Sequence, residues 1–221
     1  MAFKLLIEDF DRQSFNYVIE EGEGDKPSRV YIEGPSMCAE KVNKNKRRYI
    51  REEMLQEVQR YTKEEISQAK ALGELNHPST AEVNLERACH MVTELKPQGD
   101  EVIGRSKVLS TPCGKIVESL IRDGVSVGMS TRSLGRLVEE AGGINRVEDM
   151  KLIAIDCVAD PSYPGAFVDG ILESKQWICD NNGNFCEVCE QFETNISNLP
   201  RKNVNDHLVS AVADFLKAIS S

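Results

Sequence analysis

The stretch that most constrains the fold covers residues 148–159, where apolar side chains are almost continuous around one carboxylate, Asp156. A run of this kind predicts a strand that is buried on both faces. An ionised carboxylate in such a strand is costly unless it is hydrogen-bonded or paired. We therefore expect Asp156 to have a partner inside the protein, and an imidazole would be a suitable one.

Length and composition limit the classes of protein. The 221 residues suffice for one core with an appendage, and we predict a domain over 1–173 and a tail over 174–221. The net charge of −9 argues against a nucleic-acid-binding surface. The sequence has no apolar run of about 18 residues that would span a membrane. Glu8 and Asp9 interrupt the N-terminus where a signal peptide would still be apolar. The seven cysteines are scattered and odd in number, which favours a reducing, cytosolic compartment.

The pattern of apolar and turn residues predicts a chain with more strands than helices. Amphipathic spacing indicates helices over 50–71 and 111–124, and a third over 205–221 in the tail. An Asn-Gly turn indicates a hairpin over 177–186. The remaining strands are expected over 3–9, 30–39, 72–77, 88–95, 102–109, 125–135 and 148–159.

The strand predicted over 125–135 carries a candidate nucleophile. Side chains alternate across a strand, so Ser130 and Arg132 share one face, which we expect to be open, with the small Gly128 beside them. His77 stands at the end of an earlier strand. A serine hydroxyl, an imidazole that accepts its proton and a carboxylate that orients the imidazole form a nucleophilic site. The alternative interpretation is that His77 is structural and Ser130 merely faces solvent.

Four motifs together resemble one family, the prohead core protein proteases of T-even-type tailed phages, which are serine proteases related in fold to herpesvirus assemblin. They are Tyr31-Ile-Glu-Gly34, Val42-Asn-Lys-Asn-Lys-Arg-Arg-Tyr49, Gly73-Glu-Leu-Asn-His-Pro78 and Ser130-Thr-Arg-Ser-Leu-Gly135. The resemblance covers roughly residues 3–173. It implies an α+β fold with a mixed, mainly antiparallel, β-barrel-like core surrounded by helices, followed by the C-terminal tail helix.

The resemblance also assigns roles to individual residues. It implies that His77 is the catalytic base, Ser130 the nucleophile and Asp156 the third member of the site. His90 is not preferred as the third member, because it precedes the serine in the chain. Arg132 is our candidate for supporting the oxyanion, although backbone N–H groups are the more usual donors.

The resemblance further implies a substrate class and a compartment. The enzyme would act inside the viral procapsid, in the host cytoplasm, where it degrades scaffold or core proteins and trims capsid proteins after Glu in Leu/Ile-x-Glu sites. We expect it to form a homo-oligomer and to need no cofactor. A cation in the glutamate subsite would come from Arg47 or Arg48, within a run of four positive charges that is otherwise a solvated loop.

The same cleavage preference matches the chain itself. Ile171-Leu-Glu173 precedes Ser174 where the composition changes, so we expect self-cleavage after Glu173 to release the tail. Leu6-Ile-Glu8 also matches, near the N-terminus, as does Leu72-Gly-Glu74, which the fold would protect.

Three other interpretations stay open. Glu74, His77 and His90 would be the ligands of a metal-dependent hydrolase. A weak zinc pattern joins three cysteines of the tail to a histidine (Cys179, Cys186, Cys189 and His207). The third interpretation is a non-enzymatic capsid-assembly or scaffold component on the same fold, with the terminal helix as its working part.

Overall fold

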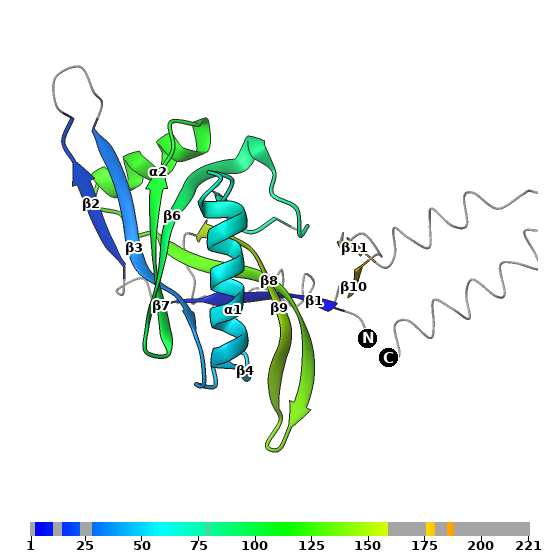
Figure 1. Cartoon of the computed structure of the whole chain (residues 1–221). Coiled ribbons are helices and arrows are strands. Elements are labelled where there is room, and N and C mark those ends of the chain that lie inside the picture. The colour runs from blue at the N-terminus through cyan, green and yellow to red at the C-terminus, as the bar shows by residue number, and fades with distance from the viewer. Residues whose placement is uncertain are drawn as a thin grey trace, which may run out of the picture.

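The computed structural model describes residues 3–10, 15–22, 28–78, 80–158, 176–179 and 185–187. In this part of the chain two β-sheets pack together with two α-helices (Figure 1). The sheets are separate and do not close into a barrel, so the architecture is α+β but the predicted barrel-like core is wrong.

The first sheet has the strand order β11-β10-β1-β8-β9-β4. All its pairs are antiparallel except β4–β9. The long hairpin of β8 and β9 turns at Gly142 and Gly143, whose φ values of 83° and 70° favour glycine. The strand bounds are β1 Phe3–Asp9, β4 Arg47–Tyr49, β8 Gly128–Glu140, β9 Ile144–Val158, β10 Gln176–Cys179 and β11 Phe185–Glu187.

The second sheet is antiparallel throughout and has the order β2-β3-β7-β6-β5. A parallel bridge between Leu75 and Cys157 joins the end of β5 to β9 of the first sheet. The contact is close: a Cβ added to Gly73 would lie 2.1 Å from the carbonyl oxygen of Ile155. The strand bounds are β2 Asn16–Glu20, β3 Arg29–Cys38, β5 Leu72–Glu74, β6 Ala88–Gln98 and β7 Glu101–Val108.

Helix α1 (Arg51–Tyr61) packs on β9 and continues into the π-helical turn η2 (Thr62–Ile66), so the predicted helix over 50–71 ends earlier than expected. Helix α2 (Pro112–Arg122) packs on β6. It starts where the Thr111 hydroxyl accepts the Gly114 N–H at 3.1 Å, and a 3-10 turn, η3 (Leu85–Arg87), precedes β6.

Apolar side chains cover both faces of the β8–β9 hairpin near its open end. Ile155 and Cys157 belong to the main core, together with Met54 and Val58 of α1. A smaller cluster on the other face contains Leu5, Ile7, Ala81 and Leu134, with Ile153 packed against it. This double burial is the reason that β9 is almost continuously apolar.

Several sequence predictions differ from the structure in detail. Strand β8 begins at Gly128 and runs to Glu140, rather than covering 125–135, and β2 was not predicted. The face that carries Ser130 and Arg132 is fully buried, not open. Burial of this face follows from the cluster around Leu134 and Ala81, which the strand pattern alone does not contain.

The tail is described only in part. Strands β10 and β11 pair as the predicted hairpin, and β10 extends the first sheet by pairing with β1. The hairpin turn, Glu173, Ser174 and the predicted helix over 205–221 lie outside the described residues. The described helices include none with the length and apolar character needed to cross a membrane.

Candidate active site

The carboxylate of Asp156 is fully buried and receives hydrogen bonds from three residues. Nδ1 of His77 lies 2.9 Å from Oδ2, and the backbone N–H of Glu74 donates to Oδ1 at 3.1 Å. The guanidinium of Arg132 donates to both oxygens, at 2.9 and 3.3 Å. The expectation that Asp156 has internal partners, an imidazole among them, is confirmed.

Arg132 is the largest fully buried side chain in the described part of the chain. Besides Asp156 it binds Oε1 of Glu74, at 3.0 Å from Nη2. Its Nη1 donates to the carbonyl oxygens of Thr80, Ala81 and Glu82, at 2.7, 3.3 and 3.3 Å. The guanidinium therefore fixes the loop after His77 onto β8, and all three of its nitrogens are engaged.

The pKa of Asp156 lies below its ordinary value of 3.8. Burial alone would raise this pKa, but the hydrogen bond with His77 and the positive charge of Arg132 outweigh it. Because Nδ1 of the neutral imidazole faces a carboxylate, it carries the proton and leaves the Nε2 lone pair as the basic position.

Ser130 lies directly opposite Asp156 in the β8–β9 ladder, so both side chains are on one face of the sheet. The serine is fully buried, and its hydroxyl donates to the backbone carbonyl of Glu8 at 3.2 Å. Glu8 belongs to β1, the strand on the other side of β8. The Ser130 hydroxyl thus donates to β1.

The Glu8 side chain points to the opposite face of the sheet, into a cluster of donors from the segment 43–49. Oε1 accepts hydrogen bonds from Tyr49 at 2.7 Å and from Arg47 at 3.0 Å. Oε2 accepts from Asn43 at 2.6 Å and Asn45 at 2.9 Å. Burial nevertheless raises the pKa of Glu8, because it outweighs the lowering effect of Arg47.

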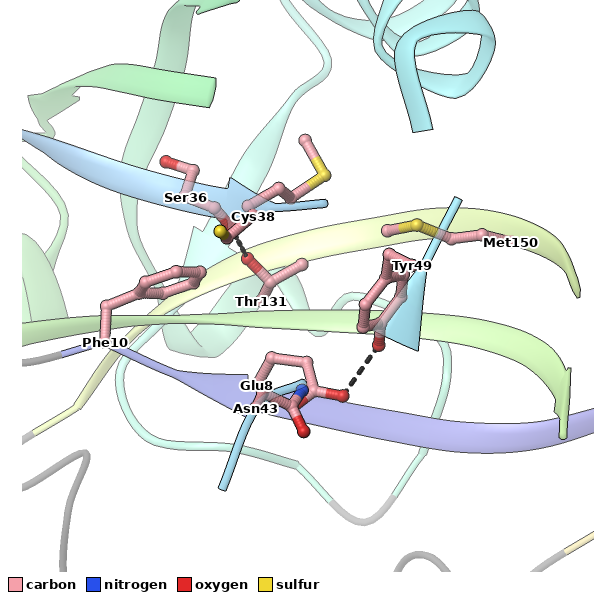
Figure 2. Close-up of a pocket in the computed structure, with 9 residues that line it drawn as sticks. Glu8, Phe10, Ser36, Cys38, Asn43, Tyr49, Thr131 and Met150 are labelled. Atoms are coloured by element: carbon pink, nitrogen blue, oxygen red, sulfur yellow. Dashed lines mark hydrogen bonds between the residues drawn. The ribbon is translucent and has the colours of Figure 1, made fainter. Parts of the chain in front are cut away.

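A cavity of about 60 Å³ adjoins this cluster. Figure 2 shows the Glu8 carboxylate and the Tyr49 hydroxyl joined by their hydrogen bond, with Thr131 bonded to the Ser36 carbonyl nearby. Thr131 faces the cavity, while its neighbours Ser130 and Arg132 face the Asp156 side of the sheet. The lining residues are Glu8, Phe10, Ser36, Met37, Cys38, Asn43, Tyr49, Thr131 and Met150.

The structure brings His77, Asp156 and Arg132 into contact, with Ser130 opposite Asp156. The predicted substrate-binding cations are already paired: Arg47 with Glu8, and the half-buried Arg48 with Glu140 at 2.7 Å and Glu40 at 3.3 Å.

The structure also bears on His90 and on the two metal-binding interpretations. His90 is fully buried, and burial lowers its pKa to about 4, so its ring is neutral at physiological pH. Among the described residues no group of three or more His, Cys, Asp or Glu could hold a metal ion. Cys189 and His207 of the weak zinc pattern lie outside the described part.

Two acidic residues, Glu74 and Glu8, take part in the site in ways that the sequence did not predict. Glu74 was considered only as a metal ligand beside His77 and His90, whereas it is fully buried and accepts a hydrogen bond from Arg132. The donors around Glu8 come from a turn and a short strand. Asn43 and Asn45 belong to the turn before β4, where Lys46 has a φ of 56° and donates its N–H to the Asn43 carbonyl, while Arg47 and Tyr49 share one face of β4.

Comparison with known proteins defines the class of this chain as a peptidase. The family described as "Prohead core protein serine protease" matches residues 15–176, and the chain belongs to that family. It is 39% identical over 150 residues to the "Prohead core protein protease" of Enterobacteria phage T4, covering 66% of this chain and 70% of the relative. The fold matches the solved structure of the bacteriophage T4 capsid assembly protease with a TM-score of 0.65 and 31% identity, over 72% of this chain and 99% of the other.

The buried ion cluster predicts a large effect of Arg132→Met on stability. Removing one partner leaves Asp156 and Glu74 as buried charges, which typically costs about 3–5 kcal/mol. Urea denaturation of the purified protein measures the loss. Arg48→Met is the matched control, because breaking a half-exposed pair costs at most about 1 kcal/mol. Equal losses of stability in the two variants would show that the buried ion cluster does not depend on Arg132.

The lowered pKa of Asp156 predicts the direction of acid destabilisation. A carboxyl whose pKa is lowered by folding contributes stability above its unfolded pKa, and that stability is lost as the pH falls through the folded pKa. We expect the free energy of unfolding to drop between about pH 5 and pH 2. The drop should be smaller in Asp156→Asn, measured by urea denaturation across this range. Parallel curves for the two proteins would show that Asp156 does not carry the effect.

Proposed function

We propose that this chain is a serine endopeptidase that matures a viral procapsid, with Ser130 as nucleophile, His77 as general base and Asp156 as the orienting carboxylate. One observation carries the proposal. The contact between His77 Nδ1 and Asp156 Oδ2, 2.9 Å long, lies on the sheet face where Asp156 is paired with Ser130. Membership of a serine protease family supports the same assignment.

The chemistry follows from these roles. The Ser130 oxygen attacks the carbonyl carbon of the substrate while His77 Nε2 takes the hydroxyl proton. Asp156 stabilises the resulting imidazolium, which then protonates the leaving amine as the peptide bond breaks. Water then gives a proton to His77 and attacks the acyl-enzyme, and the imidazolium returns that proton to the Ser130 oxygen as the acid is released.

We further propose that Arg132 is a positioning residue. Its predicted role in supporting the oxyanion is less favoured, because its nitrogens are engaged with Asp156, Glu74 and the carbonyls of 80–82. In this role it holds Asp156 ionised beside His77. Backbone N–H groups would then stabilise the oxyanion, as they do in most serine proteases.

The proposed substrates are scaffold or core proteins and capsid proteins, cut after Glu in Leu/Ile-x-Glu sites inside the procapsid in the host cytoplasm. The names of the T4 relatives, a prohead core protein protease and a capsid assembly protease, support this class. We propose a self-processing precursor that acts as a homo-oligomer, with 1–173 as the protease domain and 174–221 as a removable tail. Arg47 and Arg48 are the candidate cations of the glutamate subsite.

A second candidate is a non-enzymatic assembly component on the same fold. The observation that favours it is the full burial of Ser130, whose hydroxyl donates to the carbonyl of Glu8 in β1. An assay that reports bond cleavage separates the two candidates.

Ser130→Ala should abolish cleavage of a peptide containing Leu-Ile-Glu, because the variant lacks the attacking oxygen. The rate is expected to fall about 10⁶-fold, the scale observed when a serine nucleophile is removed. Chromatography of the digested peptide measures the rate, and Ser126→Ala, at an exposed serine just before β8, is the control. Undiminished cleavage by Ser130→Ala, with contaminating proteases excluded, would refute the assigned nucleophile.

Self-processing is tested at Glu173. Mass spectrometry of the incubated wild-type protein should show a species ending at Glu173, because the proposed subsite recognises the glutamate carboxylate. Glu173→Gln should retain its full mass, and so should Ser130→Ala. Glu187→Gln is the matched control, because it removes another glutamate of the tail and should leave processing unchanged. Release at the same bond in Glu173→Gln would contradict the proposed specificity.

A further inference from the structure

Strand β1 lies between the candidate nucleophile strand, β8, and β10 of the tail, and its residues Leu5, Leu6 and Ile7 are buried. Its residues Lys4 to Asp9 pair antiparallel with Gly135 to Ser130 of β8. Proteins commonly recognise extended peptides by adding them as a strand to a sheet. Within this strand, the carbonyl of Glu8 accepts the Ser130 hydroxyl at 3.2 Å, so the Glu8–Asp9 bond is the peptide bond at the nucleophile.

The side chain of Glu8 occupies a site built for a carboxylate. Tyr49, Arg47, Asn45 and Asn43 all donate to its two oxygens, at distances between 2.6 and 3.0 Å. Asn45 and Arg47 also donate to the carbonyl of the preceding residue, Ile7, at 3.1 and 3.4 Å. The segment 43–49 therefore holds both an acidic side chain and the backbone just before it.

We propose that β1 is an internal pseudosubstrate: residues 3–9 fill the peptide-binding groove along β8, and Asn43, Asn45, Arg47 and Tyr49 form the subsite for the acidic side chain that precedes the scissile bond. This inference rests on the proposed role of Ser130 in identifying the groove. It adds the occupant of the groove, the residues of the subsite and a means of regulation.

Two further observations agree with β1 being an occupant that another peptide can replace. The hydroxyl of Ser130 donates to the Glu8 carbonyl oxygen, whereas attack requires its oxygen to approach the carbonyl carbon, so the contact is that of an uncut strand. With β1 in place Ser130 is fully buried, and a second peptide cannot reach it.

Occupancy by β1 lowers the apparent affinity for any other peptide. If the groove is vacant in only about 10% of molecules, the apparent dissociation constant rises about tenfold. A substitution that weakens the binding of β1 in the groove should therefore strengthen the binding of a peptide supplied from outside.

Binding is measured in the Ser130→Ala background, so that no cleavage occurs. The probe is a fluorescent peptide with the sequence of residues 3–10, and anisotropy reports its binding. We expect the chain that also carries Glu8→Ala to bind the probe about tenfold more tightly than Ser130→Ala alone. Glu33→Ala is the matched control, because it removes a glutamate that pairs with an arginine, Arg105, in the other sheet. A probe with glutamine in place of its glutamate should bind more weakly.

A second measurement uses the folded chain with its native Glu8. Excess unlabelled peptide is added to Ser130→Ala, and hydrogen exchange is followed by mass spectrometry. Displacement of β1 should accelerate exchange of residues 3–9 while β9 stays protected. Exchange of residues 3–9 that is unaffected by the peptide, together with equal probe binding with and without Glu8→Ala, would overturn the proposal and make β1 a permanent strand. Because neither readout needs catalysis, failure of Ser130 as nucleophile is distinguishable from failure of this inference.

Discussion

The structure around the site depends on one buried ionic cluster, in which Arg132 lies between the carboxylates of Asp156 and Glu74. Each of these three side chains is fully buried, so none has water as an alternative partner. The cluster joins β8, β9 and β5, and through the carbonyls of 80–82 it also fixes the loop after His77. The orientation of the His77 imidazole therefore depends on ion pairs between residues of both sheets.

The sequence was most informative at one residue that interrupts a regular pattern, the carboxylate of Asp156 within the apolar strand β9. A carboxylate within the apolar run of β9 had to be paired, and the structure pairs it with His77, the histidine at the end of a strand. Strands β6 and β7 and helix α2 were predictable for a different reason, because turn residues and periodicity agree with the local structure there.

What the sequence could not reveal was the environment on each side of a strand. Alternation puts Ser130 and Arg132 on one face, but it does not tell whether solvent, a loop or another strand covers that face. The pairing of Arg47 with Glu8 could not be predicted for the same reason. The two residues are 39 positions apart and meet only because of the order of strands in the sheet. Closure of a barrel likewise depends on how sheets meet, and the two sheets here stay separate.

The burial of Arg47 has a consequence for selectivity. Arg47 is only 4% exposed, so an occupant of that pocket without a carboxylate would not replace the ion pair that Glu8 forms with this buried guanidinium. Discrimination at such a place arises from a penalty on the wrong ligand more than from an attraction to the right one. A polar but neutral side chain of the same size would be rejected on electrostatic grounds alone, and the segment 43–49 would act as a filter for charge.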